Sequence, residues 1–158
     1  MSRSESESEN SSITLRIMRL SHAEGLSLPS YATAGAAGMD LVAANTEDIV
    51  LGSLERAAVP TGLCLAIPSG FEGQVRARSG RARKEGLALV NAPGTIDEDY
   101  RGEVQVLVVN LSHTPVTIRR GERIAQLVLS RVQRAEVCEV TSLDETERGT
   151  SGFGSTGV

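Results

Sequence analysis

Short apolar runs, each about the length of a β-strand, recur along most of this sequence and are separated by turn-forming residues. MDLVAA, GLCLAIP and RIAQLVLSRV are examples, and Gly, Pro, Asn or Ser stands at most of the breaks. Runs of this length and spacing are typical of an all-β sandwich, barrel or jelly roll. Because only 3% of the residues are aromatic, the core must be built from Val, Leu, Ile and Ala, which suit strands better than long helices.

The expected strands lie between residues 13 and 140. They are ITLRIMRL, MDLVAA, DIVL, RAAVP, GLCLAIP, FEGQVRA, LALV, GEVQVLVVNLS, PVTIRRG, RIAQLVLSRV and AEVCEV. In VQVLVVNL both alternating faces are apolar, which predicts a strand covered on both sides. One short helix is expected, from Ser79 as a possible N-cap to Gly86 as the C′ residue.

Length and composition favour one domain with a polar segment at each end. Residues 1–12 alternate Ser and Glu and are expected to be a disordered tail, and residues 13–143 to form the β domain. Residues 144–158 are rich in Gly, Ser and Thr, which predicts a flexible C-terminal arm. Fully extended, such an arm spans ~50 Å, against a radius of gyration of roughly 15 Å for the body. It is therefore long enough to touch a neighbouring subunit.

Charge, cysteine content and hydropathy argue against several classes of protein. The net charge is −4, and the basic cluster at residues 76–84 has no interleaved aromatic residue, so no nucleic-acid partner is expected. Cys64 and Cys138 lack CxxC spacing, which favours buried, reduced thiols over a zinc site. No apolar stretch of ~18 residues and no signal-peptide pattern is present, so we expect a cytoplasmic protein without a membrane partner.

The glycine-rich segment GTSGFGSTGV contains a G-x-G-x-x-G pattern over residues 152–157. A dinucleotide-binding loop must follow a strand and open a helix, and a phosphate loop needs a following Lys, so neither interpretation holds here. Exposed amides, the hydroxyls of Ser155 and Thr156, and Arg148 upstream nevertheless suit phosphate oxygens. Phe153 suits stacking on a base. A disordered glycine tail is the alternative interpretation.

The segment NAPGTIDEDYRGEV, residues 91–104, places acidic residues at the junction of a turn and a strong strand. Such residues are often only solvated, which is one interpretation. In the other, a hairpin places a carboxylate beside a bound ligand and the ring of Tyr100 against a sugar.

Five segments, in order, resemble the five motifs of the homotrimeric dUTP pyrophosphatase (dUTPase) family. They are AGMDL at 37–41, ARSGRA at 77–82, NAPGTIDEDYRGEV at 91–104, RGERIAQLV at 120–128 and RGTSGFGSTG at 148–157. Each motif alone is weak, but five in order with matching spacing are specific, and they span nearly the whole chain after its tail. The resemblance implies a distorted jelly roll (the β-clip, dUTPase-like fold) with one short helix and a flexible arm.

The resemblance also implies hydrolysis of dUTP to dUMP and pyrophosphate. Asp97 would be the general base for the attacking water and Arg148 a second catalytic group, while Asp40 would hold Mg²⁺ through water in its outer shell. The residues implied for the base and sugar are Asn91, Gly94, Thr95, Ile96, Tyr100 and Phe153. Those implied for the phosphates are Arg78, Ser79, Gly80, Gln126, Gly154, Ser155 and Thr156.

By the same resemblance, the protein would be a homotrimer whose active sites combine residues from three subunits, with the arm closing as a lid. Four positions depart from the commonest motif forms: Met39, Ala77, Arg81 and Ser151. Arg81 and Arg83 leave open how the short helix packs, or whether they contact a neighbouring subunit or the phosphates.

Three alternatives to a dUTPase remain. One is a dCTP deaminase, alone or bifunctional with dUTPase activity, and another is a non-catalytic module on this fold that senses nucleotides or binds a partner protein. The third is a structural jelly-roll protein.

Overall fold

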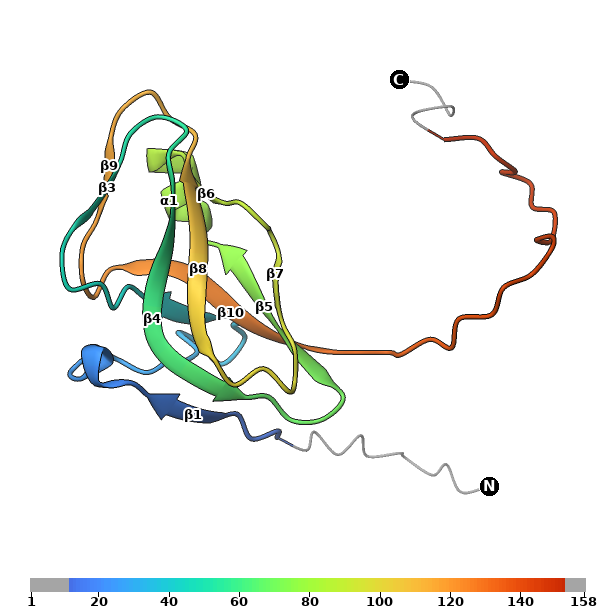
Figure 1. Ribbon diagram of the computed structural model, residues 1–158, viewed down its shortest axis with the longest axis horizontal. Coiled ribbons are helices and arrows are strands. Elements are labelled where there is room, and N and C mark those ends of the chain that lie inside the picture. Colours follow the sequence, from blue (N-terminus) through green and yellow to red (C-terminus); the bar gives the residue numbers. More distant parts are fainter. Residues whose placement is uncertain (1–11, 153–158) are drawn as a thin grey trace, which may run out of the picture.

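The computed structural model describes residues 12–152, which form an antiparallel β body and an extended C-terminal segment (Figure 1). Residues 1–11 of the expected tail and 153–158 of the expected arm lie outside the described residues. In order, the elements are β1 (Arg16–Arg19), the 3-10 turn η1 (Ser21–Ala23), β2 (Met39–Val42), β3 (Ile49–Leu51), β4 (Arg56–Ala66), β5 (Phe71–Ala77), α1 (Ser79–Glu85), β6 (Leu87–Leu89), β7 (Gly94–Ile96), β8 (Glu103–Asn110), β9 (Val116–Ile118) and β10 (Arg123–Arg131).

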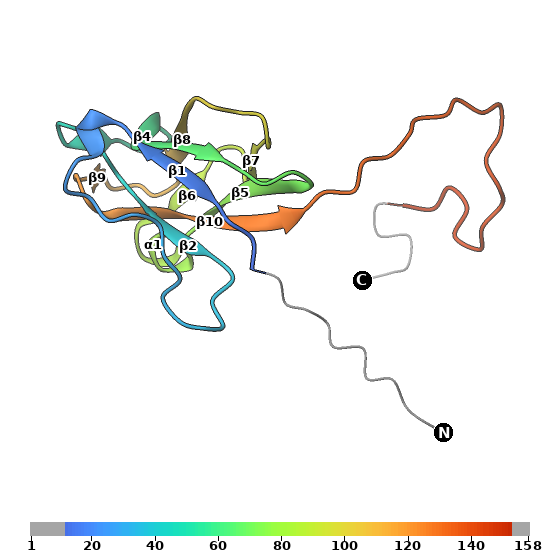
Figure 2. The same cartoon turned by 90° about the horizontal axis from the view of Figure 1, so that it is seen from below.

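Two four-stranded sheets face each other and enclose the core. The first has the order β1-β4-β8-β6 and the second β2-β10-β5-β7, while β3 and β9 form a separate pair. Every pairing between these strands is antiparallel. Figure 2 shows the two layers edge-on, with β1, β4 and β8 above β2 and β10. The all-β, jelly-roll expectation is confirmed.

The core is aliphatic because alternate residues of both sheets point inward. In β8, Val104, Val106 and Val108 are buried, and from the second sheet Leu41 and Leu127 meet them in the same cluster. The buried apolar set consists of Val, Leu, Ile and Ala with Met39 and Cys64, as the low aromatic content predicted.

The prediction that residues 104–111 are covered on both sides is wrong for the single chain. The outward face of β8 carries Gln105 and Leu107, and the Leu107 side chain is 39% exposed. The strand itself is regular and pairs with β4 and β6. Its second apolar face is therefore left open by the described residues.

The prediction of a strand at residues 135–140 is also wrong. The segment contains no strand, and Val137 is 94% exposed. Residues 132–151 are exposed throughout. Val132 and Arg134 still contact Gly70 and Glu98, and from residue 135 the chain runs away from the body (Figures 1 and 2). A run that reads as a strand finds no partner strand here because the chain has already left both sheets.

Local expectations were met in part. The runs RAAVP and GLCLAIP form one strand, β4, with a register irregularity between Pro60 and Cys64. Helix α1 begins at Ser79 with Arg78 as N-cap, so Ser79 is not the cap, whereas Gly86 ends the helix in the left-handed conformation as expected (φ 69°). Cys64 is buried as expected, but Cys138 is exposed.

Within residues 12–152, no helix is long and apolar enough to cross a membrane. The expected cytoplasmic location stays a prediction.

Candidate active site

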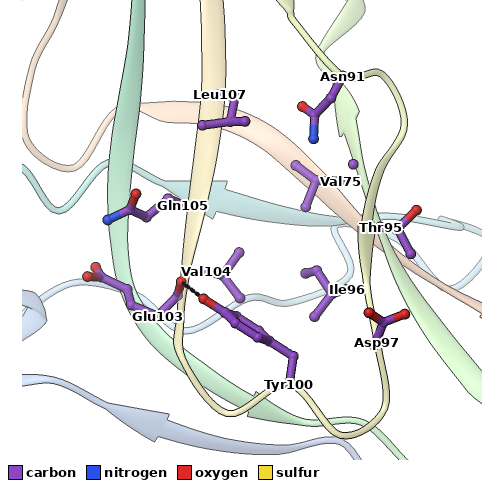
Figure 3. Close-up of a pocket in the computed structure, with 11 residues that line it drawn as sticks. Val75, Asn91, Thr95, Ile96, Asp97, Tyr100, Glu103, Val104, Gln105 and Leu107 are labelled. Carbon is purple, nitrogen blue, oxygen red and sulfur yellow. Dashed lines mark hydrogen bonds between the residues drawn. The ribbon is translucent and has the colours of Figure 1, made fainter.

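A pocket of about 460 Å³ lies between β7 and β8, which belong to different sheets (Figure 3). Asn91 points into the gap at one end, and the ring of Tyr100 closes the other. The lining residues are Val75, Asn91, Gly94, Thr95, Ile96, Asp97, Tyr100, Glu103, Val104, Gln105 and Leu107. The structure thus gathers Asp97 and all the base and sugar residues expected from the described chain.

The pocket wall at Gly94 depends on the absence of a side chain. A Cβ added there would lie 3.3 Å from both Asn91 Nδ2 and Val75 Cβ. Gly94 pairs with Val75 across the β5–β7 ladder, so the backbone of residues 94–96 is fixed by the sheet. A flat ring entering beside Asn91 would therefore meet rigid backbone rather than mobile side chains.

The turn that follows β7 is held by side chains other than Asp97. The Glu98 carboxylate accepts the Gly70 N–H at 2.7 Å, and Arg101 donates to the Glu98 carbonyl at 2.7 Å. The Tyr100 hydroxyl donates to the Glu103 carbonyl at 3.0 Å. Asp97 itself is exposed where β7 runs into the turn (Figure 3). Its carboxylate is therefore available to solvent and to a ligand.

A second cluster surrounds Asp40 on β2. Arg78 Nε donates to Asp40 Oδ1 at 2.9 Å, and Arg123 donates to Asp40 Oδ2 at 3.3 Å. Gln126 on β10 lies directly opposite Asp40, so both side chains leave the sheet on the same face. The close approach needs Gly38, because a Cβ there would lie 3.2 Å from Gln126 Cβ.

Ser79 and Gly80 continue from this cluster into the first turn of α1, and both are exposed. Space around Gly80 is open, with nothing within 4 Å of an added Cβ. The structure therefore brings together Asp40, Arg78, Ser79, Gly80 and Gln126, the described residues expected for phosphate and metal.

The two groups of residues are separated within one chain. Asp97 follows Ile96, whose partner on β5 is Gly73, and Arg78 comes five residues after Gly73. Asp97 is one residue further from Arg78 than Ile96 is, so the offset along the sheet is about six residues, or roughly 20 Å at ~3.3 Å per strand residue. Arg78 also lies beyond the Gly94 end of β7, whereas Asp97 is at the other end. A phosphate chain that leaves the pocket past Asp97 would move away from Arg78 of the same chain.

Arg148 is far from either group and interacts locally. Its Nε donates to the Ser151 carbonyl at 3.0 Å in the exposed C-terminal segment. The other expected arm residues lie outside the described part of the chain: Phe153, Gly154, Ser155 and Thr156.

The Asp40 environment fits an outer-shell metal ligand. Among the described residues, no group of three or more His, Cys, Asp or Glu side chains could hold a metal ion directly. Each Asp40 oxygen already accepts one arginine N–H, and the side chain is 20% exposed, which leaves room to accept hydrogen bonds from water. Hydrated Mg²⁺ is bound in this way, with most of its water shell kept.

Sequence reasoning assigned no role to several residues that shape the site. Glu98 and Arg123 form the contacts described above, and Glu103 lines the pocket while accepting the Gly62 N–H at 2.7 Å and pairing with His22 at 2.8 Å. Glu98 and Glu103 belong to the quoted segment 91–104, so their place in the hairpin was the available signal.

The two antiparallel four-stranded sheets define a jelly-roll protein, with a pocket between β7 and β8 and an arginine-bound carboxylate, Asp40, elsewhere on its surface. A family model described as dUTPase matches residues 24–157. The chain belongs to the dUTPase family.

Named relatives and solved structures agree with this assignment. The chain is 58% identical to the deoxyuridine 5'-triphosphate nucleotidohydrolase of Zymomonas mobilis, covering 92% of this chain and 99% of that protein. The enzyme of the same name from a Wolbachia of Drosophila simulans is 54% identical, with 94% and 99% covered. The dUTPase of Staphylococcus bacteriophage 80alpha with dUpNHpp superposes with a TM-score of 0.83 at 28% identity, covering 93% of this chain and all of that one.

Proposed function

We propose that this protein hydrolyses dUTP to dUMP and pyrophosphate, with Asp97 as the general base. The observation that carries the proposal is the hairpin pocket, in which Asn91 and the backbone of residues 94–96 face the gap and Asp97 lies at its mouth. The high identity to named nucleotidohydrolases supports the same reaction.

Selection of the base and the sugar follows from the pocket wall. Asn91 and the backbone from Gly94 to Ile96 would hydrogen-bond the uracil edge, and a site built on paired donors and acceptors rejects a mismatched edge by ~10⁴–10⁵. The rigid backbone beside Gly94 would exclude the methyl group of thymine. Tyr100, whose hydroxyl is tied to the Glu103 carbonyl, would pack against the deoxyribose and leave no room for a 2′-hydroxyl.

Asp97 would orient and deprotonate the water that attacks the α-phosphorus. Proton transfer by a positioned base contributes typically ~10²–10⁴ in rate, so most of the acceleration must come from charge stabilisation around the phosphates. Arg78, Ser79, Gly80 and Gln126 are the residues that would bind those phosphates. Mg²⁺, held through water by Asp40, would supply further positive charge at the phosphate oxygens when bound.

We propose a homotrimer with shared sites, and the separation of the two groups within one chain supports it. A pocket from one copy would receive its phosphate-binding residues from another. The open face of the first sheet supports an interface between copies, because Ala58 pairs with Leu107, and Ala88 with Val109, on the outward side of neighbouring strands.

The exposed segment 135–140 fits the same assembly. β1 is an outer strand of the first sheet, and Arg16 and Arg19 on it are exposed. Glu136 and Glu139 are three residues apart in the segment, as Arg16 and Arg19 are on β1, so it could add antiparallel to the β1 edge of another copy with opposite charges facing each other. This would lead the arm away from its own pocket. Arg148 and Phe153 would then close over a neighbour's nucleotide.

The reaction is tested by incubating the purified chain with dUTP, dCTP, dTTP or UTP and Mg²⁺, and by measuring pyrophosphate and ammonia. We expect pyrophosphate from dUTP alone. Ammonia from dCTP would identify a deaminase instead, and tight dUTP binding without any product would identify a nucleotide-sensing module.

The shared site is tested by complementation between two inactive variants, Asp97→Asn and Arg78→Ala. Unfolded together in equal amounts and refolded, random assembly gives an intact pair of residues at about a quarter of the sites, so activity should return although neither variant has it alone. Each variant refolded alone is the control. No recovery in mixed trimers would refute the sharing of sites between copies.

A further inference from the structure

Helix α1 carries Ser79 and Gly80 on its first turn, yet it has few contacts that fix its position. None of its seven residues is buried against the described part of the chain. Arg81 and Glu85 are its partly buried residues, and the others are exposed. The Arg81 side chain is 12% exposed, although it stands where the resembling motif has an apolar residue.

Arg81 binds two carboxylates with one guanidinium group. Its Nε and one terminal nitrogen donate to Glu85 Oε2, at 2.9 and 2.6 Å, within the same helix. The other terminal nitrogen donates to Glu122 Oε2 at 3.2 Å, in the turn that precedes β10. A longer contact of 3.5 Å reaches the Thr117 carbonyl on β9.

Glu122 connects this contact to the Asp40 cluster. Its carboxylate also accepts the Arg119 N–H at 3.2 Å, and its carbonyl accepts the Ala43 N–H at 2.9 Å, just after β2. The next residue, Arg123, donates to Asp40. The turn is thus tied to the strand that carries Asp40, and Arg81 ties the helix to the turn.

We propose that Arg81 is a positioning residue, which holds the Arg78–Gly80 turn at a fixed place relative to Asp40 and Gln126 through its ion pairs with Glu122 and Glu85. The proposal rests on the proposed function, since it assigns this turn to the nucleotide's phosphates. Arg81 does not touch the nucleotide, because its guanidinium N–H groups already donate to Glu85 and Glu122. This answers whether Arg81 contacts the phosphates: it acts through the backbone of the helix.

The pairing predicts an asymmetry between partial and complete removal. Neutralising Arg81 alone leaves the Glu85 carboxylate without its ion-pair partner and Glu122 with only the longer Arg119 contact of 3.8 Å, whereas neutralising all three groups removes both charges. Breaking one partner of such a network is more damaging than replacing the whole network. The helix can therefore be held by an ion-pair network or by uncharged side chains. A single uncharged residue beside the two remaining carboxylates is the least favourable arrangement.

The first experiment compares Arg81→Met with Arg83→Met, an exposed arginine on the same helix. Affinity is measured by calorimetry for dUMP and for the imido analogue of dUTP. In Arg81→Met we expect the analogue to bind ~10-fold more weakly, which is the affinity lost with about one hydrogen bond to a charged group, while dUMP binding is unchanged. Arg83→Met should match the wild type for both ligands. An equal loss for both ligands, or no loss for the analogue, overturns the proposal.

The second experiment tests rescue. The variant Arg81→Met/Glu85→Gln/Glu122→Gln should bind the analogue more tightly than Arg81→Met alone, and Arg81→Lys should lie between Arg81→Met and the wild type. If the triple variant is weaker than the single one, the ionic mechanism is wrong. If Arg81→Met fails to fold, the affinities for dUMP and for the analogue are measured in Arg81→Lys and Glu122→Gln instead. Weaker binding of the analogue alone supports the proposal, and an equal loss for both ligands or no loss overturns it.

Amide hydrogen exchange separates this proposal from the proposed function. In the unliganded full chain, the amides of residues 79–82 should exchange faster in Arg81→Met than in Arg83→Met. Unchanged exchange at these amides overturns the positioning role. If the wild type releases no pyrophosphate from dUTP, the proposed function is overturned. Faster exchange in Arg81→Met than in Arg83→Met would still support the positioning role of Arg81 in that case.

Discussion

Replacement of Asp97 by Asn separates the chemistry of the proposed site from its architecture. The Asp97 side chain is exposed at the end of β7, and the hairpin is held instead by Glu98, Tyr100 and Arg101. Asn has the same shape as Asp and lacks only the negative charge and the ability to take a proton. The substitution therefore removes the proposed base and leaves the pocket in place.

Two magnitudes follow from this geometry. An exposed substitution away from buried contacts changes the free energy of unfolding by no more than about 0.5 kcal/mol. Loss of a positioned base lowers the rate by ~10²–10⁴, which corresponds to roughly 2.7–5.5 kcal/mol of transition-state stabilisation. The expected loss of activity thus exceeds the expected loss of stability several-fold.

The assay is pyrophosphate release from dUTP, measured beside thermal unfolding and binding of the imido analogue. Asp99→Asn is the matched control, because it makes the same charge change at another exposed position of the same turn. We expect Asp97→Asn to lose turnover, keep its melting temperature and still bind the analogue. Asp99→Asn should resemble the wild type in all three measurements.

Two results would refute the reasoning. Loss of the base should leave at most about a hundredth of the wild-type rate. If Asp97→Asn retained a tenth or more, Asp97 would not be the base. If Asp99→Asn lost as much activity as Asp97→Asn, the effect would belong to the charge of the turn rather than to a particular carboxylate.

Three further predictions concern the fold, the sugar and the arm. Gly62→Ala should lower the melting temperature by several degrees more than Gly25→Ala. Both glycines have positive φ, but only a Cβ at Gly62 would overlap Ala23, and such overpacking costs ~1–3 kcal/mol. Equal shifts in thermal unfolding would contradict this. Tyr100→Phe should keep the preference for dUTP over UTP in kcat/KM, whereas Tyr100→Ala should weaken it, and a preference unchanged in both would remove the ring's role. A chain truncated before Arg148 should fold and assemble but lose most dUTP turnover, and full turnover would show that the arm is dispensable.

The fold was predictable where burial is decided within the chain. In β5, the run FEGQVRA alternates inward and outward residues, and its partners Leu127 and Ile96 complete the same core. The aliphatic composition and the turn residues between runs carry this information locally. The pocket was predictable for a different reason, because most of its lining residues belong to one contiguous motif, residues 91–104.

Two wrong predictions, the covering of both faces of β8 and the strand at residues 135–140, share one physical cause. Leu107 on β8 and Val137 in the C-terminal segment are apolar at strand spacing, but the described residues leave both exposed. An apolar pattern reports that a surface is to be buried and not which chain buries it. A single sequence therefore cannot distinguish a strand that completes its own sheet from one that contacts another copy.

Arg81 shows the complementary limit of sequence reasoning. The departure from an apolar residue was visible, but its meaning depends on Glu122, which lies 41 residues later in the chain. Only the fold brings the β9–β10 turn beside the helix, and only then do two carboxylates explain the partly buried guanidinium of Arg81. The residues proposed to bind substrate were found from motifs, whereas the residue proposed to position them, Arg81, needed three-dimensional contacts.

The opposed directions of the two residue groups have a consequence for how such a site works. Gly94 and Asp97 set a direction along β7 that leads away from Arg78 of the same chain. Under the proposed sharing of sites, one copy alone would bind the nucleoside but not the terminal phosphates. Affinity for dUMP should then be insensitive to dilution below the assembly concentration, while affinity for the triphosphate analogue should fall with it. Assembly would in this way control the phosphate half of recognition more than the base half, because Asn91, Tyr100 and the backbone of residues 94–96 all come from one chain.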